Sequence, residues 1–571
     1  MKHFTFSTRL ALSVLAMLIA IPSAMAYSFE EGGIYYNDYN ANRVRVTYKD
    51  DNFNSYSGQV NVPATVTHNG ETYTVIGVDS YAFLYCTELT SVILPYGIDD
   101  IGDNAFAGCT KLTSVIIPGT VTNIGWYAFN NCTSLPRIII PNSVTEMKHS
   151  AFEGCTALSS VTLSNQLETI ESMTFYGCTS LTNITIPASV KTIKYQAFNC
   201  TGLESVTMNE GLTTIENYAF RSCENLKQVT IPNTVTTMGS EVFAYCPELT
   251  TVTLSTSLEA IEYGAFRECG KLERITIPNS VQRVGFNAFY SCEGLKEVKI
   301  GDGVTEIGDY AFYRCTEMTT LTLGNHLETI KNHAFSGCYA LLSVTIPNSV
   351  TTIENDAFSY CHALRSAVIG NGVTTIGDYA FHECENIANL VIGNNVTSIG
   401  INAFYGCNSL KKVKIPDSVE TIGNCAFLQC AGITHIDIGS GLKSLGYGVF
   451  AADWQLVSFT CHAETPPTFN TDPSWSDFNQ NVYDQAMLYV PEGSISKYRN
   501  AEVWKRFTNI KAIPNHVPGD VNGDGEVNIA DVNALIDAIL TGNHNIDGDV
   551  NEDGEVNIAD VNAVISIILN Q

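Results

Sequence analysis

One stretch of 23 residues decides the fold: Cys109-Thr-Lys-Leu-Thr-Ser-Val-Ile-Ile-Pro-Gly-Thr-Val-Thr-Asn-Ile-Gly-Trp-Tyr-Ala-Phe-Asn-Asn131. Its first half alternates like a short strand, so we expect Leu112, Val115 and Ile117 to point inward, with an outward residue between the last two. Pro118 ends that strand because it has no N–H to donate. The stretch therefore predicts one short strand on one side of a coil.

The second half of the stretch predicts the rest of the coil. Val121 and Ile124 begin a second extended segment, and Gly125 permits the turn after it. Ala128 and Phe129 are expected in a short helical or irregular return, with Phe129 filling the coil. One such unit cannot bury both of its faces, so stacked copies are needed to make a continuous core.

The cysteines show how often the stretch recurs. They repeat every 23 residues, except for one step of 22 between Cys178 and Cys200, and phenylalanine follows the same period three residues earlier. We place the missing residue between Phe198 and Cys200. A period of this length and regularity indicates a solenoid. The repeating cysteines are Cys86, Cys109, Cys132, Cys155, Cys178, Cys200, Cys223, Cys246, Cys269, Cys292, Cys315, Cys338, Cys361, Cys384, Cys407 and Cys430.

The repeat resembles the BspA-like leucine-rich-repeat family over residues 75–460. That resemblance implies a mainly β chain, a right-handed solenoid with a 23-residue period and β-rich caps. Residues 27–74 are the expected N-terminal cap, in which Asn69-Gly70 predicts a hairpin. Residues 461–513, with Trp504, are the expected C-terminal cap, because a bare last coil would expose an apolar face.

The cysteine ladder has two interpretations. An even number of cysteines in an exported protein usually indicates disulfides. Stacked coils bring equivalent Cα atoms close but keep their Cβ vectors parallel, which is poor disulfide geometry. We therefore expect buried free thiols that pack as small apolar groups. Cys425 and Cys461 lie off the repeat and either pair with each other or stay free.

The N-terminus and the composition bear on location and partners. Residues 1–26 combine a basic start, an apolar run of twelve residues and an Ala-Met-Ala end, which predicts a signal peptide and a secreted or cell-surface product beginning at Tyr27. A net charge of −28 argues against nucleic acid as a partner. No later run of 18 apolar residues predicts a membrane span.

The solenoid surface offers no obvious catalytic site. Motifs of zinc proteases, serine hydrolases and phosphate-binding loops are missing, so we expect no enzyme. Outward threonines such as Thr253 and Thr276 could contact a glycan or a protein, although threonine also simply packs well on an exposed sheet. The surface reads as poor in large aromatic residues, and no ligand site can be named on it.

A different composition begins after the linker 514–518. Residues 519–571 contain eleven acidic residues and no Lys or Arg, and they hold two nearly identical twelve-residue loops. Oxygen-bearing residues at loop positions 1, 3, 5, 7, 9 and 12, with glycine at position 6, are typical of calcium loops, so we expect two Ca²⁺ ions. The expected ligands are Asp520, Asn522, Asp524, Glu526 through its carbonyl, Asn528 and Asp531, and then Asp549, Asn551, Asp553, Glu555 through its carbonyl, Asn557 and Asp560.

Each loop leads into an amphipathic helical pattern, the first formed by Val532, Leu535, Ile536, Ile539 and Leu540 and the second by Val561, Val564, Ile565, Ile568 and Leu569. Two loop–helix units that close with aspartate at position 12 resemble the type I dockerin family. The resemblance implies a small α-helical domain over 519–571 that docks onto a cohesin of a scaffold protein. The chain departs from the family at loop positions 10 and 11, where Ile529-Ala530 and Ile558-Ala559 replace the frequent hydroxyl residues.

These features predict an exported, non-catalytic binding or adhesion protein. Its solenoid would present a surface to a host protein, another cell or a polysaccharide, and its calcium-dependent dockerin would tether it to a cohesin-bearing scaffold or to the cell surface. The alternative is a non-catalytic subunit of a cellulosome-like complex that degrades polysaccharides.

Overall fold

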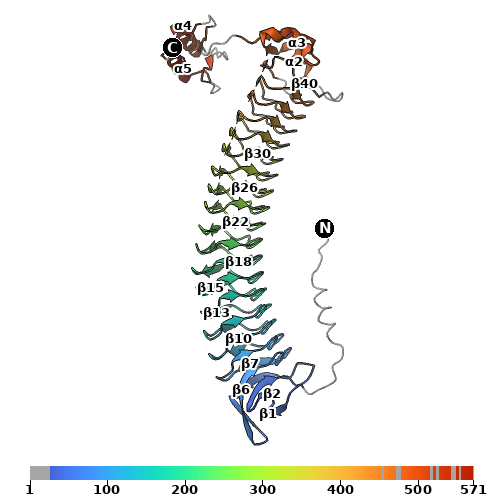
Figure 1. Ribbon diagram of the computed structural model, residues 1–571, viewed down its shortest axis with the longest axis vertical. Helices are drawn as coiled ribbons and strands as arrows, with labels where there is room; N and C mark the ends of the chain where they lie inside the picture. The colour runs from blue at the N-terminus through green and yellow to red at the C-terminus, as the bar shows by residue number, and fades with distance from the viewer. Residues whose placement is uncertain are drawn as a thin grey trace.

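The computed structural model describes residues 26–451, 455–470, 478–514, 519–522, 526–541, 548–551 and 555–569. Figure 1 shows a long, gently bowed solenoid, with a β cap at its N-terminal end and helical segments at its other end. The predicted signal peptide lies outside the described residues, apart from Ala26.

Each coil carries two short strands, and each strand pairs in parallel with its counterpart one coil away, as Arg137 does with Ser160. The first strand of successive coils forms a series of sheets. Its members are β7 (Leu89–Ile93), β9 (Ser114–Ile116), β11 (Arg137–Ile139), β13 (Ser160–Thr162), β15 (Asn183–Ile186), β17 (Ser205–Met208), β19 (Gln228–Thr230), β21 (Thr251–Thr253), β23 (Arg274–Thr276), β25 (Glu297–Lys299), β27 (Thr320–Thr322), β29 (Ser343–Ile346), β31 (Ser366–Ile369), β33 (Asn389–Val391), β35 (Lys412–Ile415), β37 (His435–Ile438) and β39 (Ser458–Cys461).

The second strand of each coil is only two residues long and forms its own ladder. Its members are β8 (Asp100–Ile101), β10 (Asn123–Ile124), β12 (Glu146–Met147), β14 (Thr169–Ile170), β16 (Thr192–Ile193), β18 (Thr214–Ile215), β20 (Thr237–Met238), β22 (Ala260–Ile261), β24 (Arg283–Val284), β26 (Glu306–Ile307), β28 (Thr329–Ile330), β30 (Thr352–Ile353), β32 (Thr375–Ile376), β34 (Ser398–Ile399), β36 (Thr421–Ile422), β38 (Ser444–Leu445) and β40 (Thr468–Phe469).

The predicted inward and outward positions are confirmed. Leu112, Val115 and Ile117 are buried, whereas Ile116 is 62% exposed. The phenylalanines stack from Phe83 to Phe450 with consecutive ring centroids 4.8–5.7 Å apart and nearly parallel planes. One continuous core therefore runs through the solenoid and both caps.

The return segment of each coil is a run of turns that visits the left-handed region twice. In the coil of Phe129 the left-handed residues are Tyr127 and Asn131, both with φ of 57°. This conformation costs a non-glycine residue about 1–2 kcal/mol. Stacking offsets the cost, because the N–H groups of Tyr127, Phe129 and Asn131 donate to carbonyls one coil on, at 3.2, 2.8 and 2.7 Å. The return segments thus form a third hydrogen-bonded ladder.

Glycine ends the second strand for a reason other than the one that the sequence suggested. Gly125 is not among the residues with positive φ. A Cβ built on it would instead lie 2.6 Å from the backbone nitrogen of Asp103 in the preceding coil. The glycine is therefore needed for close stacking of coils and not for the turn itself.

The short coil departs from the prediction. Cys200 has φ of 58° and occupies the left-handed position, while Thr201 takes the inward place that cysteine holds in other coils. The hydroxyl of Thr201 donates to the carbonyl of Phe198 at 2.9 Å. The missing residue therefore falls between Thr201 and Leu203, and placing it before Cys200 was wrong. The reason is that stacking requires two residues between the phenylalanine and the buried ladder position, as in Phe198-Asn-Cys-Thr201.

The N-terminal cap comprises β1 (Phe29–Glu31), β2 (Ile34–Asn40), β3 (Arg43–Thr47), β4 (Gly58–Asn61), β5 (Thr65–His68) and β6 (Glu71–Val78). Strands β5 and β6 pair antiparallel across Asn69-Gly70, which confirms the predicted hairpin. Strand β6 then pairs in parallel with β8, and β4 with β7, so the cap continues both ladders.

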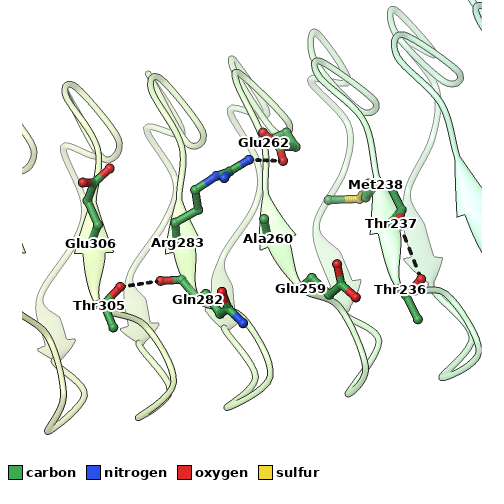
Figure 2. A pocket seen from close by; sticks show the side chains of 10 residues that line it. All are labelled: Thr236, Thr237, Met238, Glu259, Ala260, Glu262, Gln282, Arg283, Thr305 and Glu306. Carbon is green, nitrogen blue, oxygen red and sulfur yellow. Dashed lines mark hydrogen bonds and ion pairs between the residues drawn. The ribbon is translucent and has the colours of Figure 1, made fainter.

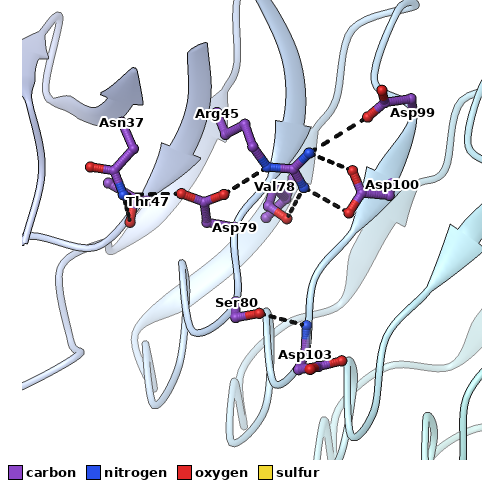
Figure 3. A network of polar contacts seen from close by, with 9 residues as sticks. All are labelled: Asn37, Arg45, Thr47, Val78, Asp79, Ser80, Asp99, Asp100 and Asp103. Atoms are coloured by element: carbon purple, nitrogen blue, oxygen red, sulfur yellow. Dashed lines mark hydrogen bonds and ion pairs between the residues drawn. The ribbon is translucent and has the colours of Figure 1, made fainter. Parts of the chain in front are cut away.

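A buried arginine ties this cap to the first coil (Figure 3). The Arg45 guanidinium lies 2.6 Å from carboxylate oxygens of both Asp79 and Asp100, and it also donates to the Val78 carbonyl at 3.1 Å. A Cβ on Gly77 would lie 2.4 Å from the same guanidinium, so glycine makes room for the arginine.

The C-terminal cap continues the first ladder through β41 (Met487–Val490) and β42 (Asn509–Ala512), with α2 (Gln480–Gln485), η1 (Glu492–Ser494), α3 (Ile495–Asn500) and η2 (Trp504–Arg506) around them. Trp504 is fully buried, and its indole donates to the Pro467 carbonyl at 2.8 Å. Its ring lies against Phe459 and Tyr498, so an aromatic cluster closes the end of the core.

The acidic C-terminal segment has a separate, small core. Helices α4 (Ile529–Thr541) and α5 (Ile558–Leu569) follow the two predicted loops. The buried residues of this core are Val527, Val532, Leu535, Val561 and Val564.

Candidate functional site

The described parts of the two predicted calcium loops make matching hydrogen bonds. Position 1 of each loop is sheltered, since Asp520 is 6% exposed and the Asp549 side chain is also 6% exposed. Asn522, Glu526, Asn551 and Glu555 lie at the surface, and Asn528 and Asn557 are half-buried. Asp524 and Asp553, the expected ligands at position 5, lie outside the described residues.

The aspartates at position 12 close the loops. The Asp531 carboxylate is fully buried and accepts the N–H of Asn522 at 3.0 Å and of Asn528 at 2.8 Å, one on each oxygen. Asp560 is equally buried and accepts the N–H groups of Asn551 and Asn557 at 3.0 and 2.9 Å. Each aspartate therefore fixes the backbone of positions 3 and 9, a role that the sequence did not reveal.

The residues present fit a divalent cation. Burying an ionised carboxylate is costly unless an opposite charge compensates it. Asp531 and Asp560 are fully buried in a segment that has no Lys or Arg of its own. Carboxylate and carbonyl oxygens are the ligands that Ca²⁺ prefers, so a bound calcium would supply the missing charge.

Two further contacts refine the predicted ligand set. The side-chain oxygen of Asn528 accepts the N–H of Ala530 at 2.8 Å, and Asn557 does the same with Ala559. The asparagines at position 9 thus cap α4 and α5. Lys412 of the solenoid strand β35 lies 3.0 Å from the Asp549 carboxylate, so a calcium ion in the second loop would share that carboxylate with a lysine.

The helix faces differ from the prediction. We expected Ile536, Leu540, Ile565 and Leu569 to pack with the other apolar residues of their helices. Instead Ile536 and Ile565 are each 38% exposed, and Leu540 and Leu569 are each 79% exposed. Ile529 and Ile558, at loop position 10, are both 68% exposed. A module this small cannot cover every apolar residue of two helices, and the uncovered ones form two equivalent apolar surfaces.

The cysteine ladder is buried and reduced, as predicted. All 18 cysteines are free thiols, Cys425 and Cys461 included, and Cys200 alone is only half-buried. Burial raises the pKa of Cys155 to about 12, so its reactive thiolate is scarce at neutral pH. The ladder is therefore part of the core.

The solenoid surface is richer in aromatic residues than the sequence suggested, and that expectation was wrong. Return segments gather exposed rings along one side of the coils, because the two turns of each return face solvent. The exposed rings there include Trp126, Tyr195, Tyr263, Phe286, Tyr360 and Tyr379. Rings from neighbouring coils meet there, as Tyr263 and Phe286 do with centroids 5.7 Å apart.

A polar depression of about 470 Å³ lies where the second ladder divides between β20 and β22 (Figure 2). The small side chain of Ala260 leaves it open, and Glu259, Glu306 and Gln282 line it together with Arg283, which donates to Glu262 at 2.5 Å. All of these side chains are exposed or half-buried. The depression therefore lacks the desolvated acid, base or nucleophile that is typical of an active site.

Comparisons with known proteins agree with this architecture. The model of the BspA type leucine rich repeat region matches residues 76–198, 147–273, 259–388 and 374–465, and that of the dockerin type I domain matches residues 518–569. A search of curated proteins found no match.

Several solved structures are similar to the chain. A leucine-rich repeat protein from Bacteroides ovatus is 23% identical, with a TM-score of 0.43, and the match covers 81% of this chain and 100% of that one. A leucine rich cell surface protein from Faecalibacterium prausnitzii is 25% identical, with a TM-score of 0.29 and coverage of 79% and 96%. A leucine rich repeat protein from T. pallidum is 25% identical, with a TM-score of 0.29 and coverage of 39% and 90%.

The two family matches indicate a protein-binding module tethered through a dockerin, a domain type that generally binds calcium and cohesins. Both kinds of domain are typically non-catalytic. In the part of the chain that the structure describes, no helix has the length and apolar content needed to cross a bilayer. Because the repeat model matches well over half of its residues, the chain belongs to the BspA type leucine rich repeat family.

Proposed function

We propose that the chain is an exported, non-catalytic binding or adhesion protein, held on a cohesin-bearing scaffold or cell surface by a dockerin that binds two calcium ions. The proposal places Ca²⁺ in each loop, with Asp520, Asn522, Asp524, Glu526, Asn528 and Asp531 around the first and Asp549, Asn551, Asp553, Glu555, Asn557 and Asp560 around the second. The signal-peptide pattern of residues 1–26 supports export.

One observation carries the proposal: the C-terminal segment has two equivalent buried carboxylates, Asp531 and Asp560, each followed by a helix with an uncovered apolar surface. Calcium would neutralise the loops and fix the start of each helix. The exposed isoleucines would then form the docking contact, because a helix surface with a central apolar group and a polar rim is typical of protein interfaces.

The duplication makes the docking experiment specific. Ile529 and Ile558 are equally exposed, so either copy could occupy a cohesin. We expect Ile529→Asp alone to weaken cohesin binding only slightly, and Ile529→Asp with Ile558→Asp to abolish it. Asp520→Ala with Asp549→Ala should also abolish binding, through loss of calcium, and should do so without touching the exposed surface.

The measurement is calorimetry of the mature chain against a panel of cohesins, with and without calcium. Val457→Asp, an exposed position of the solenoid, is the matched control and should bind normally. If no cohesin binds at micromolar concentration in calcium, the tethering function is wrong.

The second candidate function is a non-catalytic subunit of a cellulosome-like, polysaccharide-degrading complex. The dockerin match favours it to the same degree, because such complexes assemble through cohesins. Binding to cohesins of a scaffold that also carries polysaccharide-degrading enzymes would support this alternative over adhesion.

A further inference from the structure

Six side chains on the return segments of five successive coils form a continuous row, which we call the tyrosine–arginine ladder: Tyr218, Arg221, Tyr245, Arg267, Tyr290 and Tyr313. The Arg221 guanidinium lies 4.7 Å from the Tyr245 ring centroid. Arg267 lies between Tyr245 and Tyr290, at 5.6 and 5.0 Å from their centroids. All six side chains are half-buried, so they are held in place and still meet solvent.

A second row of rings lies beside this ladder. Tyr263 and Phe286 stack with centroids 5.7 Å apart and are 38% and 42% exposed. Tyr310 follows Phe286 at 5.8 Å and meets Tyr313 of the ladder at 5.5 Å. Tyrosine and arginine are enriched in protein interfaces and dominate their binding energy.

The ladder is rich in hydrogen-bond donors and carries little net charge. The tyrosine hydroxyls and guanidinium groups can donate hydrogen bonds. The faces of the rings and guanidinium groups inside the ladder are covered, because each group stacks on its neighbour in the next coil. Glu241 and Glu268 pair with Arg221 and Arg267 at 2.9 and 3.3 Å and neutralise them. The surface therefore suits a neutral ligand that offers acceptors and can pack against ring edges.

The order of the ladder adds a spacing. Over four of the five coils arginine and tyrosine alternate, in the order Arg221, Tyr245, Arg267 and Tyr290, so like groups recur every second coil there. Tyr313 then follows Tyr290 directly, with ring centroids 5.2 Å apart. Neighbouring groups of the alternating part lie 4.7–5.6 Å apart, so that repeat is about 10 Å. A polyproline II helix turns once in three residues, or about 9.3 Å, and therefore presents the same face to every second coil. An extended β-strand presents the same face every second residue, or about every 6.7 Å. Its side chains would therefore not coincide with groups that recur every second coil.

The chemistry of proline matches the same surface. A polyproline II backbone makes no internal hydrogen bonds, so its carbonyls need outside donors, and proline brings no N–H that would need an acceptor. Proline-rich segments elsewhere dock on aromatic-lined surfaces because the ligand is already ordered before binding.

We propose that the tyrosine–arginine ladder binds a proline-rich polypeptide in the polyproline II conformation, lying along the solenoid axis. Tyrosine hydroxyls and guanidinium N–H groups would donate to its carbonyls, and the proline rings would pack between neighbouring tyrosine edges. This proposal rests on the proposed function. It names the class of partner that the tethered solenoid would bind.

The test uses the mature full chain and fluorescently labelled oligoprolines of three, six, nine and twelve residues. The ladder spans four coil steps, or about 19 Å, which about six polyproline residues cover. Affinity should rise from three to about six residues and then level off. A glycine–serine peptide of twelve residues should bind at least tenfold more weakly than dodecaproline.

Substitutions in the tyrosine–arginine ladder test whether oligoproline binds there. Tyr245→Ala and Arg267→Gln should each weaken dodecaproline binding about tenfold, and the pair should abolish it. Tyr96→Ala removes a ring that is 80% exposed and lies outside the ladder, and it should change nothing. Circular dichroism checks the fold, and Arg267→Gln, a surface change, keeps the test valid if Tyr245→Ala unfolds.

Absence of oligoproline binding at millimolar concentration, equal binding of the glycine–serine peptide, or indifference to the ladder variants would overturn the proposal. So would a neutral oligosaccharide that binds more tightly than oligoproline and is lost in the same variants, because the surface would then serve a glycan. Cohesin binding is measured separately on the same protein, so failure of the ladder proposal and failure of tethering give different results.

Discussion

The thiol of Cys109 donates a hydrogen bond of 3.0 Å to the carbonyl of Phe83, which belongs to the preceding coil. The same contact recurs along the solenoid, as in Cys155 to Phe129 at 3.1 Å and Cys269 to Phe243 at 3.1 Å. The ladder cysteines therefore satisfy a buried carbonyl in addition to filling space. In the short coil the Thr201 hydroxyl donates instead to Phe198 of its own coil, at 2.9 Å.

This hydrogen bond predicts the order of stability of variants at the buried cysteine position. Cys269→Ala should reduce the free energy of unfolding by about 1–3 kcal/mol, because it leaves a small cavity and an unsatisfied carbonyl. Cys269→Thr should cost less, because threonine leaves a smaller cavity than alanine and its hydroxyl can donate to a phenylalanine carbonyl, as that of Thr201 does to Phe198. Urea denaturation measures both variants. A threonine variant less stable than the alanine variant would show that the hydrogen bond contributes nothing.

Thiol labelling tests burial along the whole ladder. Denatured protein should react with 18 equivalents of a thiol reagent without prior reduction, and native protein with at most one, at Cys200. Burial raises the pKa of Cys200, so its labelling should accelerate as the pH rises and more thiolate forms. Cys200→Ser, as the control, should remove the native reaction. Fewer than 18 equivalents in denatured, unreduced protein would reveal disulfides.

The Arg45 cluster predicts a weak point where the N-terminal cap joins the first coil. Arg45→Ala should cost about 1–3 kcal/mol, because the half-buried Asp79 and Asp100 would lose the charged donor to which they are hydrogen-bonded. Arg43→Ala, on the same strand but exposed, is the matched control and should be nearly neutral. Hydrogen exchange should show lost protection in β3 and β6 only. Unchanged exchange there would mean that the core alone holds the cap.

The pH dependence of the same cluster has a defined sign. Burial and the neighbouring Asp100 raise the pKa of Asp99, and together they outweigh the attraction of Arg45. The folded state therefore holds this proton more tightly than the unfolded chain does, and ionisation above the raised pKa costs stability. Asp99→Asn should raise the melting temperature at pH 7, and the gain should disappear as the pH falls and the native carboxyl becomes protonated. A gain that is equal at low pH would contradict this assignment.

Calcium should decide whether the C-terminal module folds. Among its described residues, five buried apolar side chains form the core, and its acidic loops repel one another without a cation. Calcium at 100 times its dissociation constant stabilises by about 2.7 kcal/mol per site, a large share for so small a core. We expect excess EGTA to unfold α4 and α5 and to leave the solenoid intact. Exchange protection of both helices that survives EGTA would contradict the prediction, and Asp531→Asn should shift the calcium requirement of the first loop upward.

The left-handed positions make a further prediction about the return segments. Ser291 has φ of 54°, a strained conformation for serine, so Ser291→Gly should stabilise by up to about 1 kcal/mol. Ser291→Val should destabilise by more than that, because a β-branched side chain tolerates this region poorly. Ser114, on an exposed strand position, is the control at which the same changes should have the reverse order. Thermal melts of the four variants measure the ranking.

The solenoid, its period, its inward and outward positions and the hairpin at Asn69-Gly70 could all be predicted from the amino-acid sequence. Each of these follows from local rules: alternation sets which side of a strand is buried, and a repeat that buries nothing alone must stack. The two loops of the dockerin could also be recognised in the sequence, because calcium coordination requires particular residue types at set spacings.

The contacts between residues of neighbouring coils, in contrast, became visible in the folded structure alone. Stacking, and not spacing, placed Thr201 in the cysteine ladder and Gly125 against Asp103. It also brought Arg221, Tyr245 and Arg267 together, although some 23 residues separate each from the next. The physical reason is that neighbours along the solenoid axis are distant in sequence, so their contacts depend on the register between coils, which no single coil encodes.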